Sequence, residues 1–248
     1  MNAKINGRVT TAILLLCGIL PAGCAWFGTD APLKPLYYEA VQGERQPNLI
    51  VFLRGRAGSH KSFADEGFVA AVRERDLAFD MVAPNSHLGY YVAETLVPRL
   101  KKDIIDPAKA QNYGQIWLVG ASMGGLGALM YLRSHPEDVD GVYAISPFLS
   151  YADMVDEITA AGGVRSWTPG EYDPDEDWER MLWDWLKGYA ENRDERPPIY
   201  IGFGKEDPYI GGQNLLADIL PPDRVFAVKG GHDAETMHRL WIRFLDRP

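Results

Sequence analysis

The chain has 248 residues, 46% of them hydrophobic, so it can bury one sizeable core or two small ones. Its 25 Lys and Arg against 34 Asp and Glu give a net charge of −9, which argues against a basic face that binds nucleic acid. With 24% charged residues, the composition also argues against a long disordered chain or a coiled coil.

Residues 1–23 have the pattern of an export signal. Two cations, Lys4 and Arg8, precede an apolar stretch at 12–20, and small residues follow it. This stretch is too short to cross roughly 30 Å of hydrocarbon as a helix, so cleavage is expected. We therefore predict a signal peptide at 1–23.

Residues 20–24, Leu-Pro-Ala-Gly-Cys, resemble the bacterial lipobox, which implies that cleavage leaves a lipid-anchored Cys24. Cys17 would be removed, so the mature chain could form no internal disulfide. Ala25 after the cysteine resembles lipoproteins sorted to the outer membrane. The prediction is a lipoprotein that faces the periplasm and reaches the membrane only through its lipid. An ordinary signal peptide with a chance cysteine is the alternative.

After a tether at 24–47, the domain at 48–248 alternates short apolar runs with helical patterns. Runs without polar alternation are typical of strands buried on both faces. The alternation predicts an α/β fold, with a mostly parallel central sheet and helices on both faces. The predicted strands are 49–53, 79–83, 116–119, 142–145, 199–203 and 225–228, with an edge strand at 36–41. The predicted helices are 68–72, 92–105, 126–132, 215–220 and 234–245.

An insert at 147–197 interrupts this alternation and is rich in tryptophan and acidic residues. One face of a predicted helix carries four apolar residues: Trp178, Met181, Leu182 and Trp185. Such a face must cover apolar surface. A cap over a pocket and a helical excursion packed on the sheet explain it equally well.

Residues 120–124 read Gly-Ala-Ser-Met-Gly, between a predicted strand and a predicted helix. In that context G-x-S-x-G is typical of a serine nucleophile held on a sharp turn. The turn crowds the positions two residues away, so Gly120 and Gly124 mark places where a Cβ atom would clash. We predict that Ser122 is the nucleophile and that the backbone N–H of Met123 stabilises an oxyanion at the helix N-terminus.

A serine hydroxyl needs a base, and the chain has five histidines. His232 follows the last predicted strand, at the sheet edge where catalytic groups gather. Asp207 follows the strand 199–203 and is predicted to orient His232, with Glu206 as the competing acid. The chain order of serine, acid and histidine is that of α/β-hydrolases.

Residues 120–129 resemble the nucleophile elbow of the esterase D-like group of α/β-hydrolase serine esterases, and 230–233 with 244–245 resemble that group's last loop and helix. The resemblance runs from about residue 49 to the C-terminus, outside the insert. It favours Asp207 as the acid and implies cleavage of a carboxylic ester through an acyl-enzyme.

No metal or cofactor is expected, because this mechanism needs none. The expected partner is a small-molecule or lipid-like ester. A thioesterase or peptidase with the same triad, and a non-catalytic lipid-anchored binding protein on the same fold, are the alternatives.

The second oxyanion donor is expected in the turn after the strand 49–53. Family members usually carry His-Gly there, whereas this chain carries Arg54, Gly55 and Arg56. By position, the backbone N–H of Arg56 takes the role. Arg54, Gly55 and the loop residue His87 are expected at the substrate pocket. The two guanidinium groups would favour a carboxylate- or phosphate-bearing substrate, unless they pair with surface acids instead.

Overall fold

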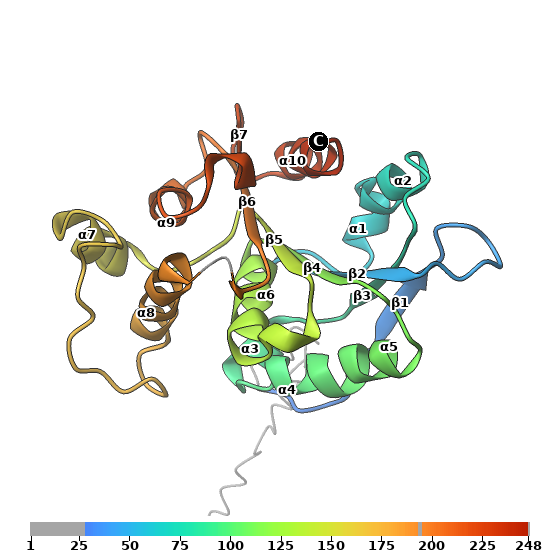
Figure 1. Ribbon diagram of the computed structural model, residues 1–248, viewed down its shortest axis with the longest axis horizontal. Coiled ribbons are helices and arrows are strands. Elements are labelled where there is room, and N and C mark those ends of the chain that lie inside the picture. Colours follow the sequence, from blue (N-terminus) through green and yellow to red (C-terminus); the bar gives the residue numbers. More distant parts are fainter. Residues whose placement is uncertain (1–27, 193–194, 248) are drawn as a thin grey trace, which may run out of the picture.

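The computed structural model describes residues 28–192 and 195–247, so the predicted signal peptide and Cys24 lie outside the described residues. Seven strands form one sheet in the order β1-β3-β2-β4-β5-β6-β7, with helices on both faces (Figure 1). β1 is antiparallel to β3, and the other pairs are parallel. The predicted mostly parallel α/β fold is confirmed. Within the described ranges, no helix combines the length and the hydropathy needed to cross a bilayer.

The strands are β1 (Pro35–Tyr38), β2 (Asn48–Leu53), β3 (Phe79–Pro84), β4 (Ile116–Ala121), β5 (Gly141–Ile145), β6 (Ile199–Gly204) and β7 (Val225–Val228). The helices are α1 (Ser62–Asp65), α2 (Phe68–Arg73), α3 (Leu88–Val92), α4 (Leu96–Leu100), α5 (Asp106–Ala110), α6 (Met123–Ser134), α7 (Ala152–Ala160), α8 (Trp178–Glu191), α9 (Ile210–Ala217) and α10 (Ala234–Leu245). A π-helical segment, η1 (Lys101–Ile105), joins α4 to α5.

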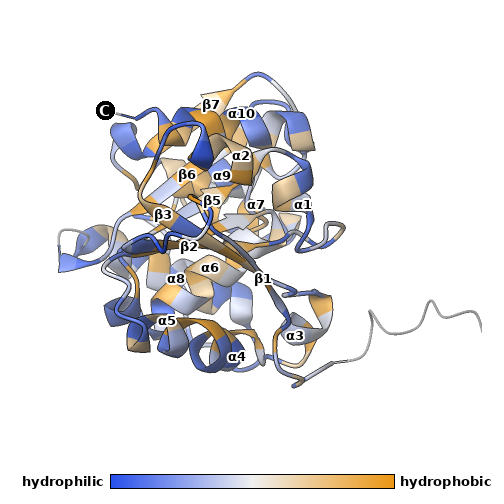
Figure 2. Cartoon of the chain, turned by 90° about the vertical axis from the view of Figure 1, so that its right-hand side faces the viewer, coloured by the Kyte–Doolittle hydropathy of each residue, from blue (hydrophilic) through white to orange (hydrophobic). Residues whose placement is uncertain are grey.

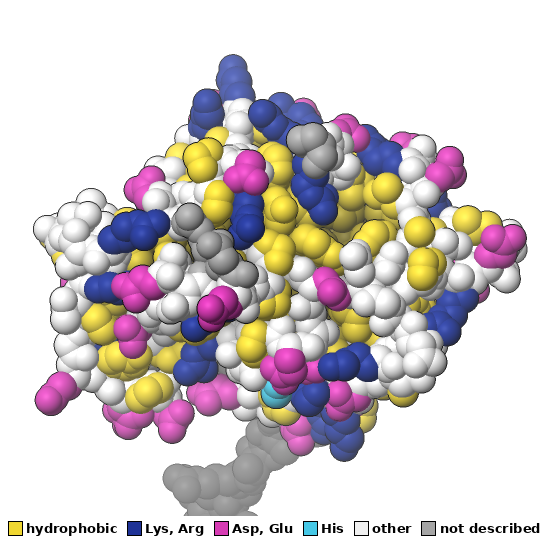
Figure 3. Space-filling model, viewed as in Figure 1, with side chains coloured by type: hydrophobic (Ala, Val, Ile, Leu, Met, Phe, Trp, Pro, Cys, Tyr) yellow, Lys and Arg dark blue, Asp and Glu magenta, His cyan; other side chains and the backbone are white. Residues whose placement is uncertain are grey.

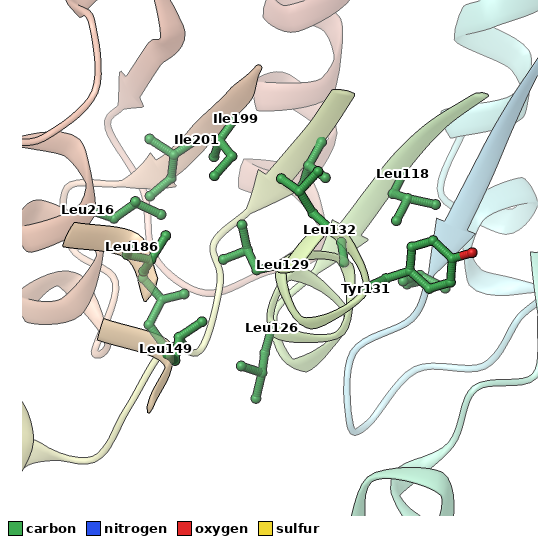
Figure 4. Packing of buried hydrophobic residues seen from close by; sticks show 14 of the residues in the cluster. Leu118, Leu126, Leu129, Tyr131, Leu132, Leu149, Leu186, Ile199, Ile201 and Leu216 are labelled. Atoms are coloured by element: carbon green, nitrogen blue, oxygen red, sulfur yellow. The ribbon is translucent and has the colours of Figure 1, made fainter. Parts of the chain in front are cut away.

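The central strands are apolar at every position because both of their faces are buried. In β4, Leu118 packs into one hydrophobic cluster and Val119 into the other, and Val142 and Tyr143 of β5 divide in the same way. α1, α2 and α10 cover one face, whereas α4, α5, α6, α8 and α9 contribute to the cluster on the other. Figure 4 shows the second cluster, and Figure 2 shows hydrophobic colour concentrated between the two helical layers.

The predicted tether at 24–47 is too long, because its described part packs on the domain. Leu33 is buried, and β1 adds an antiparallel edge to the sheet. The Thr29 N–H donates to the Gly89 carbonyl, and Arg99 pairs with Asp30 at 2.8 Å. The segment from residue 28 therefore belongs to the folded domain and lies along α3 and α4.

Two predicted helices have other bounds in the structure. The helix expected at 92–105 is divided, because Glu94 adopts a left-handed φ of 57° between α3 and α4. The helix expected at 215–220 is α9, which starts at Ile210. Gly211 and Gly212, near its start, are poor helix formers, so the sequence does not indicate a helix there. A Cβ atom on Gly211 would lie 2.8 Å from Val155 of α7.

The insert packs on the sheet through α8. Its fully buried residues are Leu182, Trp183, Leu186 and Tyr189, whereas two of the four residues predicted for that face, Trp178 and Trp185, are only partly buried. The face is therefore rotated from the predicted one, and Trp183 anchors it by donating to Ser150 Oγ at 3.2 Å.

Charges of both signs are mixed on the molecular face drawn in Figure 3, among scattered hydrophobic side chains. On this face the net negative charge of the chain does not gather into one continuous acidic field.

A buried carboxylate ties α6 to the segment before β4. Asp138 is nearly inaccessible and accepts from Lys101 at 2.8 Å, from Tyr131 at 3.0 Å and from Lys109. Burial opposes ionisation, but the hydrogen bonds from these three groups lower the pKa of Asp138 to about 2. The charged carboxylate therefore stabilises the fold.

Replacing this carboxylate by an amide should lower stability. We expect Asp138→Asn to reduce the free energy of unfolding at neutral pH by about 1–2 kcal/mol, discounted because both lysines are partly exposed to water. Because the native pKa is depressed, the difference should be present above the ordinary pKa of 3.8 and shrink as the pH falls to about 2. Urea unfolding at several pH values measures it. The exposed Asp218→Asn serves as the control, and a difference that grows on acidification would contradict the assignment.

Candidate active site

Ser122 occupies the sharp turn between β4 and α6. Its backbone is held at φ 54° and ψ −118°, a conformation that costs a non-glycine residue about 1–3 kcal/mol. Two backbone hydrogen bonds fix the turn: Ser122 N–H donates to the Ile145 carbonyl at 2.9 Å, and Phe148 N–H donates to the Ser122 carbonyl at 3.2 Å. The side chain therefore starts from a fixed point at the N-terminus of α6.

Glycines allow this turn to pack at backbone distance. A Cβ atom on Gly120 would lie 2.1 Å from the Gly124 carbonyl oxygen, and one on Gly124 would lie 1.9 Å from the Leu53 carbonyl oxygen. As predicted from the sequence, a side chain at either glycine would clash with the neighbouring backbone. Gly55 is similarly restricted, since its Cβ would lie 3.2 Å from Ser122 Cβ.

Ser122, His232 and Asp207 come together as one chain of polar side chains. Ser122 Oγ lies 2.9 Å from His232 Nε2, and His232 Nδ1 lies 2.8 Å from Asp207 Oδ2. The side chain of Asp207 has no exposed surface, whereas that of His232 is 21% exposed. Because an ionised carboxylate can only accept, His232 carries its proton on Nδ1 and leaves Nε2 free to accept from Ser122.

Asp207 is held ionised by its neighbours. Burial raises its pKa, but hydrogen bonds from His232, from the Tyr209 N–H at 2.9 Å and from the Gln213 side chain outweigh burial and leave the pKa below its ordinary value. Gln213 is itself fully buried and donates to the Pro147 carbonyl at 3.2 Å. Glu206, the competing acid, is exposed.

Backbone contacts between the ends of β6 and β7 position the loop that carries His232. A Cβ atom on Gly204 would lie 2.3 Å from the Gly230 carbonyl oxygen, and Gly230 has a φ of 135° that favours glycine. Asp233 then caps α10 by accepting from the Thr236 N–H at 2.8 Å. His232 is therefore held between a glycine contact and a helix cap.

The Arg54 guanidinium is occupied by the loop that it begins. Nε donates to the Gly55 carbonyl at 3.2 Å, Nη2 to the Arg56 carbonyl at 3.0 Å and Nη1 to Asn85 Oδ1 at 3.2 Å. Burial lowers the pKa of Arg54. Its hydrogen bonds thus go to two carbonyls and an amide, and not to the surface acids considered from the sequence.

His87 lies at the start of α3, where its Nδ1 accepts from the Gly89 N–H at 3.1 Å. This contact makes it the N-cap of α3. Its ring packs against Tyr90, with centroids 4.7 Å apart. The predicted role of His87 in substrate binding remains a prediction.

A cavity of about 870 Å³ opens over Ser122. It is lined by residues of α3, α4, α6 and α8 and of the loops at Phe148, Tyr151 and Tyr209. Arg56 lines it as an exposed residue, whereas Arg54, Gly55 and His87 are absent from its lining.

Most of the residues that surround Ser122, His232 and Asp207 belong to no motif in the sequence. Tyr209 contributes its N–H to Asp207 and its ring to His232, edge to face, with centroids 5.1 Å apart. Asn85 accepts from Arg54 across 31 residues of sequence, and Gln213 of α9 donates to Asp207 from six residues further along the chain. The only sequence signal for Tyr209 is its place two residues after Asp207.

In the described part of the chain, one group of side chains has the proximity for a metal ion: His135, Glu137 and Asp138. It lies at the C-terminal end of α6, at the far end of the helix from Ser122, and the Asp138 carboxylate is already paired with Lys101 and Lys109. The ion pairs with these two lysines account for the burial of Asp138.

Comparisons with known proteins fit this geometry. The family model named Esterase, with the description "Putative esterase", matches residues 12–227. A search of curated proteins finds no significant match.

Several solved structures share the fold. A ferulic acid esterase is 17% identical with a TM-score of 0.58, over 86% of this chain and 96% of its own. Est1E from Butyrivibrio proteoclasticus is 14% identical with a TM-score of 0.56, over 86% of this chain and 93% of its own. S-formylglutathione hydrolase from Staphylococcus aureus is 15% identical with a TM-score of 0.55, over 89% of this chain and 84% of its own. The family model spans most of the sequence and the sheet is that of these hydrolases, so the chain belongs to the Esterase family and is a carboxylic-ester hydrolase with the α/β-hydrolase fold.

Proposed function

We propose that this hydrolase cleaves a carboxylic ester through an acyl-enzyme, with Ser122, His232 and Asp207 as its catalytic triad. The observation that carries the proposal is the unbroken chain of short contacts from Ser122 Oγ through His232 to the buried Asp207. His232 Nε2 takes the hydroxyl proton as Oγ attacks the ester carbonyl. The same proton then passes to the leaving alkoxide, and a water molecule repeats the sequence on the acyl-enzyme.

The developing oxyanion is stabilised by the backbone N–H groups of Met123 and Arg56. Met123 is the first residue of α6, where helix amides point toward Ser122 and the positive end of the helix dipole favours negative charge. Arg56 belongs to the loop that begins in contact with Ser122 through Gly55. The backbone N–H groups of Met123 and Arg56 thus form the oxyanion hole next to Ser122.

Arg54 acts as the positioning residue for the second amide. Its Nε donates to the Gly55 carbonyl, which shares a peptide group with the Arg56 N–H. In a trans peptide these two groups point in opposite directions, so fixing the carbonyl fixes the direction of the N–H. The hydrogen bond to the Arg56 carbonyl restrains the next peptide as well. Arg54, which stands where family members usually carry histidine, therefore braces the loop.

A thioester or peptide remains a second substrate class for the same triad, since the geometry around Ser122 serves any acyl transfer. We retain the ester because the family match favours it.

We also propose that the mature protein is a lipoprotein anchored through Cys24 on the periplasmic side of the outer membrane. The support is the sequence pattern at 1–24 alone.

Loss of the nucleophile should abolish turnover. We expect Ser122→Ala to lower kcat for a p-nitrophenyl ester by about 10⁴–10⁶-fold and to abolish covalent labelling by a fluorophosphonate probe, with a smaller loss for Asp207→Ala. Ser166→Ala, at an exposed serine, should keep both activities. Near-normal turnover by Ser122→Ala would exclude this mechanism.

Removing the Arg54 guanidinium should weaken stabilisation of the transition state more than it weakens substrate binding. Arg54→Met is expected to reduce kcat about tenfold or more while KM changes little, because a misaligned oxyanion donor acts only once charge develops. Arg73→Met is the matched control, since Arg73 also donates to a backbone carbonyl, that of Glu39, from α2 on the other face of the sheet. A rise in KM at unchanged kcat would instead show that Arg54 binds substrate.

The anchor can be tested in cells. Cys24→Ala should prevent incorporation of radiolabelled palmitate and move the protein from the membrane to the soluble fraction, because the lipid is its expected attachment. Cys17→Ala should leave both unchanged, since Cys17 lies in the segment expected to be removed. Palmitate incorporation that persists in Cys24→Ala would refute the proposed site.

A further inference from the structure

The cavity continues far beyond the reacting serine. Its floor is one face of α6, where lining residues recur at helical spacing: Met123, Leu126, Met130, Arg133 and Ser134. With a rise of 1.5 Å per residue, the floor reaches about 12 Å from Ser122 at Met130 and about 16 Å at Arg133. The cavity is therefore a channel along the helix.

The walls of this channel are mostly apolar and come from separate segments, and the charged residues of its lining, Arg56, Glu94, Arg133 and Asp175, are all exposed to solvent. α3 and α4 supply one side through Leu88, Tyr91, Leu96 and Val97, and the insert helix α8 supplies the other through Trp178 and Met181. In Figure 1, α6 lies near the centre, with α8 to its left and α3 and α4 below it. The insert thus forms one wall of the channel while its other face packs in the core.

Of the six wall residues named above, Tyr91 and Trp178 are the two that carry a polar side-chain group. The hydroxyl of Tyr91 donates to the Met123 carbonyl at 3.0 Å, so it is already satisfied. A substrate with hydroxyl groups along its length would leave them without partners there, which is unfavourable. A methylene chain has no such groups and would displace water from apolar surface.

The side chains around the channel suit a flexible ligand. Met130 and Met181 are unbranched thioethers that adjust to the shape of a neighbour. Trp178 and Phe148 add broad aromatic surface, with ring centroids 6.2 Å apart. A short acyl group such as acetyl would touch only the end of this surface near Ser122.

We infer that the ester substrate carries an unbranched aliphatic arm of about ten carbons, which lies along α6 from Ser122 toward Met130. The inference rests on the proposed function only in placing the ester carbonyl at Ser122. The arm can belong to the acyl group or to the alcohol, and substrates of both kinds distinguish them.

Binding tests the channel without turnover. Ser122→Ala, titrated by calorimetry, should bind decanoate at least a hundredfold more tightly than butyrate. Adding Met130→Trp, which fills the channel, should weaken decanoate binding at least tenfold. Met237→Trp is the matched control, because Met237 is a partly buried methionine on α10, across the sheet from the channel. Equal affinity for decanoate and butyrate would overturn the inference.

Hydrolysis identifies which side of the ester carries the arm. For the acyl side, kcat/KM for p-nitrophenyl decanoate should exceed that for the acetate at least tenfold, and Met130→Trp should reduce this ratio whereas Met237→Trp should not. For the alcohol side, decyl acetate should be preferred over ethyl acetate. A wild type that hydrolyses acetate through Ser122 without any chain-length preference would refute the arm and leave the proposed function intact. Chain-length-dependent binding by a protein that cleaves no ester would refute the proposed function and leave the channel intact.

Discussion

The site depends on one contact between backbones. The first turn of α6 lies so close to the end of β2 that a Cβ atom on Gly124 would come within 1.9 Å of the Leu53 carbonyl oxygen. This approach brings the next residues after β2 against the proposed nucleophile, so that Gly55 touches Ser122. The elbow and the oxyanion loop, which are about 70 residues apart in the chain, thereby become one unit. A side chain at either glycine would separate them.

A second backbone contact organises the other half of the site. The ends of β6 and β7 meet where Gly204 faces the Gly230 carbonyl, and the loops beyond them carry Asp207 and His232. Because parallel strands end at the same edge, these loops reach the edge at which β4 delivers Ser122. Rigid strand ends set the distances of 2.9 and 2.8 Å between the three side chains, and the burial of Asp207 keeps water from competing for His232.

What the sequence predicts well is what local backbone constraints dictate. The strands can be predicted because burial of both faces makes them apolar throughout. Ser122 can be predicted because the turn that holds it requires glycine at positions 120 and 124, where a Cβ atom would clash. The break at Glu94 and the engagement of Arg54 with Asn85 depend on tertiary contacts that leave no periodic signal. The channel walls come from three segments that no short motif connects. Only the helix that forms its floor can be predicted from the sequence, because Met130 lies within the predicted helix 126–132.

Chemistry and specificity therefore lie on different parts of this fold. The proposed triad lies at strand ends, whereas α3, α4 and α8 shape the channel and can vary without moving these three residues. The described chain begins on the same wall, since the Thr29 N–H bonds to Gly89 of α3. Cys24 precedes Gly28 by four residues, which span at most about 14 Å. A lipid on that cysteine would hold the α3–α4 wall near a membrane surface, where esters with aliphatic arms are concentrated, so the proposed anchor and the proposed substrate support the same placement of the enzyme.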